Sequence, residues 1–133
     1  MKTKEITLCG QQVTIGYCYA TEIGYKILSD QDITDFIAEA IPALQDERMP
    51  NPQNTIYLIV AAIQAYYESL PVGPDGKKPE PPVKDSDIIY HGDPLEIGTA
   101  IGTILSLRND FYHVPKDEPK DNETKKGKKK KNA

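Results

Sequence analysis

The sequence is poor in the residues that build metal and redox centres. Its 133 residues include no tryptophan and only two cysteines and two histidines. Cys9 and Cys18 form no C-x-x-C motif, and at most one disulfide can join them. His91 and His113 lack the H-x-x-x-H type of spacing that zinc sites use. The sequence therefore predicts no metal site and no cofactor.

Long apolar runs are also missing. A helix that crosses a bilayer needs about 20 predominantly apolar residues, and the most apolar stretch here, at residues 56–67, is shorter and contains Gln64. The opening residues, MKTKEITL, are basic but are not followed by the apolar segment of a signal peptide. We therefore expect a cytoplasmic protein without a membrane anchor.

The motifs of the common catalytic and nucleotide-binding sites are absent. There is no G-x-S-x-G nucleophile elbow, no G-x-x-x-x-G-K-[ST] phosphate loop and no G-x-G-x-x-G fingerprint. Asp30, Asp32, Asp35 and Glu39 gather around a predicted helix start, where capping and the positive end of the helix dipole account for acidic residues. We expect a protein that is not an enzyme.

Basic residues are scarce in most of the chain and concentrated at its end. Residues 1–114 contain 8 Lys and Arg against 16 Asp and Glu, a net charge of −8, whereas residues 115–133 contain 8 Lys against 4 acids, a net charge of +4. Segment 115–133 has no apolar residue before Ala133, so we predict a disordered tail after one globular domain at residues 1–114. The lysines at its end are Lys125, Lys126, Lys128, Lys129, Lys130 and Lys131.

These lysines have three candidate explanations, two in the protein and one in the gene. In the gene, an adenine run that encodes residues 128–132 would let ribosomes slip backwards and append a longer C-terminal segment. In the protein, the lysines are able to hold phosphate groups of a nucleic acid electrostatically, or they serve only to keep the protein in solution. No aromatic residue lies among them for bases to stack on. This absence favours the solubilising role over nucleic-acid binding.

One helix, at residues 54–70, is predicted to organise the domain. Within its apolar part only Gln64 is polar, and a helix that is apolar on all sides belongs in the middle of a core. Asn51 is a suitable cap and Pro52 suits the first helical position. Pro71 ends the helix, because proline pushes its predecessor out of helical conformation.

Residues 4–17 alternate between apolar and polar side chains, as the strands of a half-buried β-hairpin do. A two-residue turn at Gly10-Gln11 would place Ile6 opposite Ile15. One face is then apolar and the other carries threonines. Because a lone hairpin is only marginally stable in water, we expect the apolar face to pack on a helix.

Two amphipathic helices are predicted after the hairpin. The first spans residues 20–28, and the second begins at Ile33. The first has an apolar side, which consists of Ala20, Ile23, Ile27 and Leu28. Pro42 falls within the second and is expected to kink it or end it near Ala40, because proline lacks an amide donor and clashes with the preceding turn.

The second half of the domain is predicted to hold a loop and a final helix. Residues 71–82 contain five prolines and two glycines, which predicts an exposed loop. A helical turn at residues 88–91 follows, and then a helix from Asp93 to about Arg108 that opens with DPLE, a relative of the capping box. Gly98 and Gly102 lie one turn apart, so they form a strip on this helix that carries no side chains. We expect another helix, with the central one as the candidate, to approach it closely.

These elements predict an α+β fold, in which an N-terminal β-hairpin packs on a small bundle of about four helices. A proline-rich loop at residues 71–85 interrupts the bundle. Candidate partner-binding residues are Tyr66 and Tyr67, which point to different sides of the central helix, and Gly98 and Gly102. The alternative for the tyrosines is a place at the rim of the core with their hydroxyl groups in water.

Four segments, in this order, resemble tail assembly chaperones of long-tailed bacteriophages and prophages. They are KEITLCGQQVTIGYCYATEIGYKIL, DITDFIAEAI, NTIYLIVAAIQAYYES and DPLEIGTAIGTILSLRNDFYHVP. The resemblance covers about residues 1–115 and excludes the tail. This family has no catalytic signature.

The resemblance implies a non-enzymatic protein that is made in the infected cell and is absent from the finished particle. Such chaperones coat the long, helical tape measure protein, keep its apolar stripes from aggregating and help to recruit tail tube subunits. The implied partners are the tape measure protein, the tail tube subunit and further copies of the chain. Binding an amphipathic helix calls for an apolar groove, which we expect between the central helix and the helix that carries the glycines.

Two other classes of function remain open for this sequence. A small nucleic-acid-associated or regulatory adaptor would use the lysine-rich tail and would bind heparin with a steep salt dependence. The acidic domain argues against this adaptor, because it would repel DNA. A minor structural subunit of the virion would be found in purified particles, where an assembly chaperone is absent.

Overall fold

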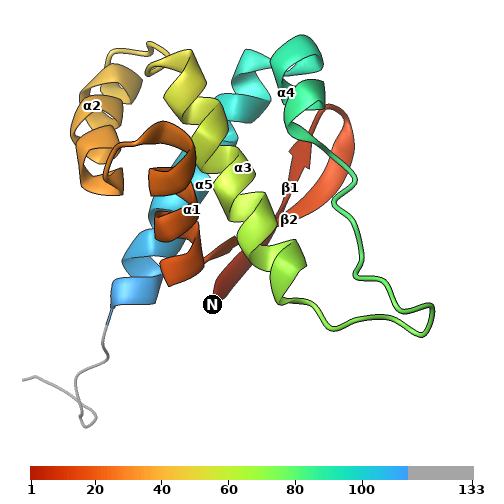
Figure 1. The fold of residues 1–133 in the computed structure, drawn as a ribbon. Helices are drawn as coiled ribbons and strands as arrows, with labels where there is room; N and C mark the ends of the chain where they lie inside the picture. Colours follow the sequence, from red (N-terminus) through yellow and green to blue (C-terminus); the bar gives the residue numbers. More distant parts are fainter. Residues whose placement is uncertain (114–133) are drawn as a thin grey trace, which may run out of the picture.

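A computed structural model describes residues 1–113 and contains a hairpin followed by helices (Figure 1). The elements are β1 (Lys2–Leu8), β2 (Gln11–Tyr17), α1 (Tyr19–Ser29), α2 (Ile33–Gln45), α3 (Pro52–Ser69), α4 (Asp85–His91) and α5 (Pro94–Tyr112). The predicted α+β class is confirmed, with five helices in the described part where about four were expected. The predicted tail, with its lysines, lies outside the described residues.

The α3 helix lies at the centre of the fold, as predicted. It contacts β2, α1, α4 and α5, with α1 on one side of it and the hairpin on the other (Figure 1). Its start is fixed as expected, because the Asn51 side chain accepts a hydrogen bond from the Asn54 amide at 3.0 Å and Pro52 occupies the first turn. Only a narrow strip of α3, which includes Gln64 and Glu68, reaches solvent.

The hairpin turn lies one residue earlier than predicted. Cys9 and Gly10 have φ values of 53° and 74°, and positive φ at both central residues is the requirement of a type I′ turn, whose twist matches that of the strands. Ile6 therefore pairs with Val13 and not with Ile15. This shift of two residues in register keeps every side chain on its predicted face. The apolar face is buried and consists of Ile6, Leu8, Val13 and Ile15.

Contacts from two helices hold the turn in place. The Cys9 amide donates to Glu96 Oε1 at 2.8 Å, and its thiol donates to the Asp87 carbonyl at 3.5 Å. Because Glu96 binds the turn, it does not complete the capping box that the sequence predicts at Asp93, which makes no side-chain cap. Burial raises the pKa of the Cys9 thiol, as do the charges of Asp87 and Glu96. Both cysteines are free.

Three helices are longer than predicted. The α2 helix continues through Pro42 to Gln45, because Ala43 is buried and keeps the last turn on the core. The α4 helix begins at Asp85, and α5 continues to Tyr112. The end of α5 is fixed by Phe111, whose ring packs on the aromatic residues that end β2 and begin α1. Residues 71–82 form the expected loop, which extends away from the helices (Figure 1).

The glycines of α5 do not contact another helix, which corrects the expected close approach. A Cβ atom added at Gly98 or Gly102 would meet no other atom within 4 Å. The side of α5 that packs on the core is a different one and consists of Ala100, Ile101, Ile104 and Leu107. The glycine strip therefore faces outward.

Alanine at Gly98 or Gly102 is expected to raise the free energy of unfolding by up to about 1 kcal/mol, because alanine favours the helix and its methyl group enters open space. Urea unfolding followed by circular dichroism measures the change. Gly92→Ala is the contrasting variant and should lower stability, since its Cβ would lie 2.5 Å from the Ile88 carbonyl oxygen, a backbone atom that cannot easily move aside. A loss of stability at Gly98 or Gly102 would show that α5 is closely packed there.

Candidate functional site: an apolar groove between α1 and α3

The α1 helix turns an unexpected side toward the core. Its buried residues are Thr21 and Tyr25, and both satisfy their hydroxyl groups. Thr21 Oγ1 donates to the Gly16 carbonyl at 2.9 Å, and the Tyr25 hydroxyl donates to Gln31 Oε1 at 2.6 Å. The Tyr25 ring also meets Phe36 edge to face, with ring centroids 5.7 Å apart.

The predicted apolar side of α1 consequently faces solvent. Ile23 is 60% exposed and Ile27 is 77% exposed. Each lies two residues after a buried one, which is about 200° around a helix of 3.6 residues per turn. Adjacent exposed isoleucines on one helix form an apolar patch of the kind that marks an interaction site.

The exposed side of α1 continues into a groove shared with α3. The groove has a volume of about 340 Å³. It is lined by Ala20, Ile23, Gly24, Ile27 and Leu28 of α1 and by Ala61, Gln64, Ala65 and Glu68 of α3. The helices approach closely, since a Cβ atom at Gly24 would lie 3.5 Å from Ala61 Cβ. Small side chains thus form the floor and the two isoleucines form one wall.

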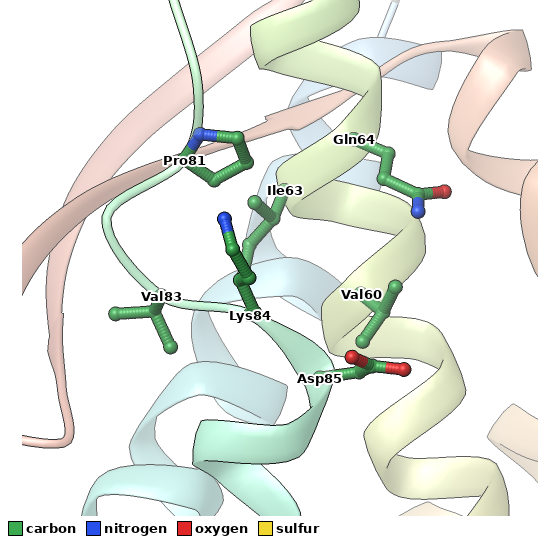
Figure 2. Close-up of a pocket in the computed structure, with 7 residues that line it drawn as sticks. All are labelled: Val60, Ile63, Gln64, Pro81, Val83, Lys84 and Asp85. Carbon is green, nitrogen blue, oxygen red and sulfur yellow. The ribbon is translucent and has the colours of Figure 1, made fainter.

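A second, smaller hollow lies on the other side of the exposed strip of α3 (Figure 2). Its volume is about 200 Å³, and Gln64 lines both hollows. Figure 2 shows Pro81 facing α3, Val83 directed away from α3, and the Lys84 side chain extended between the loop and the helix. Lys84 Nζ lies 3.5 Å from Glu80 Oε1. This hollow is narrower than the α1–α3 groove and has a charged rim.

Acidic residues outnumber basic ones in the segment that contains the α1–α3 groove. Residues 19–69, from the start of α1 to the end of α3, contain eight Asp and Glu against two Lys and Arg, a net charge of −6. Glu68 lines one end of the groove, and Asp30 follows the end of α1. Lys26 forms an ion pair with Asp32 at 3.5 Å, so its charge is already matched. An apolar floor in an acidic segment suits a helix with an apolar side flanked by lysine or arginine.

A polar cluster joins α1 to the end of α5. The Glu22 carboxylate accepts hydrogen bonds from Tyr17 at 2.7 Å and from Tyr112 at 2.7 and 2.8 Å. Arg108 Nε lies 3.9 Å from Glu22, and its guanidinium group lies over the Tyr112 ring at 5.1 Å. The hydrogen bond that the Tyr112 hydroxyl donates to Glu22 raises the pKa of Tyr112 to about 12. Burial, followed by the same carboxylate, raises the pKa of Tyr17.

Stability should therefore fall as the pH rises from about 10 to about 12. In this range unfolded tyrosine, with its pKa of about 10, loses its proton, whereas folded Tyr112 keeps its proton until about pH 12. The unfolded state then binds fewer protons, so the free energy of unfolding decreases with pH. Urea unfolding at several pH values measures this slope. Tyr112→Phe should have a shallower slope than the wild type, and equal slopes would show that Glu22 does not hold the Tyr112 proton.

The structure brings Tyr66 and Tyr67 together, which corrects the expectation that they point to different sides of α3, but it does not join them with Gly98 and Gly102. Tyr66 and Tyr67 are half-buried, with ring centroids 5.0 Å apart, and the Tyr67 hydroxyl accepts a hydrogen bond from the Thr14 amide at 3.4 Å. They therefore lie against β2, outside the α1–α3 groove. Gly98 and Gly102 lie on the outer side of α5 and do not form the expected groove with α3.

Metal-ligand clusters and membrane-spanning helices are absent from the described residues. Among residues 1–113, no three His, Cys, Asp or Glu side chains are grouped as a metal site requires. In this same part, no helix is both long enough and apolar enough to cross a membrane. Comparisons with protein-family models, curated proteins and solved structures found no match. Function has to be inferred from the surface and from the resemblance in sequence.

Proposed function

We propose that this protein is a non-enzymatic tail assembly chaperone of the phage type, acting in the cytoplasm of the host cell. It holds an amphipathic helix of the tape measure protein in the α1–α3 groove and aids assembly of the tail tube. The exposed pair Ile23 and Ile27, beside a floor of small side chains, is the observation that carries this proposal. A client helix would cover the pair with apolar residues spaced three and four apart.

The shape of the groove suits a client that must later be released. It is open to solvent and only two large apolar side chains form its wall, so one copy holds one helical segment with modest affinity. A long client with repeated apolar stripes would bind many copies, and binding along it would be strengthened by multivalency. Tail tube subunits that polymerise around the client would then displace the copies.

Co-expression with a long helical protein, should a neighbouring gene encode one, tests the proposal. We expect that protein to be insoluble alone, and soluble and co-purified with several copies of the chaperone when both are made. The chaperone should be absent from purified particles. A client that stays insoluble would contradict the proposal. Recovery of the chain from particles in fixed stoichiometry would favour a structural subunit, and salt-dependent retention on heparin would favour the adaptor.

A further inference from the structure

The two edges of the hairpin differ in whether their outward backbone groups have hydrogen-bond partners elsewhere in the fold. Along the β2 edge, the Thr14 amide donates to the Tyr67 hydroxyl at 3.4 Å, and the Gly16 carbonyl accepts from Thr21 Oγ1 at 2.9 Å. Side chains of α3 and α1 thus occupy two of the backbone groups that point away from β1. This edge is closed to another strand.

The β1 edge has no such cover. Leu8 and Gln11 flank the two-residue turn, so they exchange hydrogen bonds, and backbone groups then point alternately toward and away from β2. The amide and carbonyl groups of Thr3, Glu5 and Thr7 therefore point outward. Within residues 1–113 no backbone or side-chain group is hydrogen-bonded to them. All three residues are exposed.

A groove runs between this edge and α5. Its volume is about 400 Å³, and residues 4–7 and Gln12 form its hairpin side. Leu95, Glu96, Thr99 and Thr103 form the wall on α5. Leu95 is 77% exposed, and the neighbouring Gly98 and Gly102 add no bulk to the wall. The surface beside the unpaired β1 edge is therefore partly apolar and carries few bulky side chains, so it has room for an extended chain.

We propose that the β1 edge binds an extended segment of another protein as a third strand of the sheet. The alternating amide and carbonyl groups of an unpaired strand form hydrogen bonds with the backbone of another strand, and these backbone hydrogen bonds supply the affinity. The segment would carry small or β-branched side chains over Leu95 and Thr99, a basic side chain opposite Glu5 and an acidic one opposite Lys4. Opposite charges across paired strands favour this arrangement.

The charges on β1 argue against a second copy in this place. A symmetric antiparallel pairing that uses the outward groups of Thr3, Glu5 and Thr7 together puts Glu5 directly opposite Glu5 of the other copy. Like charges directly opposite are destabilising. The end of this chain is also a poor occupant, since residues 116–132 contain a proline and many charged residues and no apolar side chain that β-strands favour.

The proposed site shares no lining residue with the α1–α3 groove and goes beyond the chaperone function. The test of this site begins by selecting, from a random library, octapeptides that bind the full-length protein. We expect selected peptides to protect the amides of Thr3, Glu5 and Thr7 from hydrogen exchange. Binding to Glu5→Pro should be weaker by a factor of ten or more, because proline removes an outward amide and leaves the pairing with β2 intact.

Glu5→Lys serves as the matched variant, because it keeps the amide and reverses one charge. It should weaken binding of peptides with a basic residue at the facing position and strengthen binding of peptides with an acidic one. Failure to select any peptide, or peptides that leave the three amides unprotected, would overturn the proposal. So would a dimer in sedimentation experiments that Glu5→Pro abolishes, since the edge would then be occupied by a second copy.

Discussion

Aspartate at both Ile23 and Ile27 is expected to weaken binding of the helical client about a hundredfold, with little change in the free energy of unfolding. Both side chains are mostly exposed in the free protein, so their replacement removes few contacts within the fold. In the complex they would be covered by the client, where burying a charge without a partner is unfavourable. Loss of a central anchor of an interface commonly amounts to about 2–4 kcal/mol, which corresponds to a factor of about 30 to 1,000.

Ile89→Asp is the matched control for this prediction. Ile89 is 55% exposed on α4, so the substitution adds the same charge to a different exposed isoleucine. Affinity for a fluorescently labelled client helix, measured by anisotropy, should be unchanged in Ile89→Asp. A double variant at Ile23 and Ile27 that still binds with wild-type affinity, or that loses no more than Ile89→Asp, would rule out the α1–α3 groove as the client site.

The order and type of most elements could be predicted from local signals in the sequence. Asn51 and Pro52 mark the start of α3, and the alternating residues of the hairpin mark its two faces, and the structure confirms both. The register was wrong because Gly10 suits either central position of a two-residue turn. Contacts of Cys9 with Asp87 and Glu96, far along the chain, accompany the turn that is formed.

The surface was harder to predict than the elements, because periodicity shows which residues share a side but not which side is buried. On α1 the isoleucines form the apolar side, yet Thr21 and Tyr25 face the core. Their hydroxyl groups find partners only in the tertiary structure, at Gly16 and Gln31. On α5 the glycine strip suggested a packed contact and instead faces solvent. The buried side of α1 is decided by its packing on α3, which begins more than 20 residues later in the chain.

Tyr17→Ala is expected to lower the free energy of unfolding by about 3–5 kcal/mol, the range found when large buried aromatic residues are truncated. The Tyr17 side chain is 0% exposed, and its ring centroid lies 5.8 Å from that of Phe111. Truncation would leave a cavity where β2 meets α5. Because small domains are stable by only about 5–15 kcal/mol in total, urea unfolding should show a large fall in the midpoint.

Tyr17→Phe separates the packing of this residue from its hydrogen bond. It keeps the ring and removes only the bond to Glu22, so a loss of about 1 kcal/mol is expected. Glu22 retains its bonds from Tyr112, so the start of α1 should stay in place and client binding should persist. If Tyr17→Ala lost no more stability than Tyr17→Phe, the ring would not be packed between β2 and α5. If Tyr17→Phe alone abolished client binding, the groove would depend on Glu22 for its shape and not only on the exposed isoleucines.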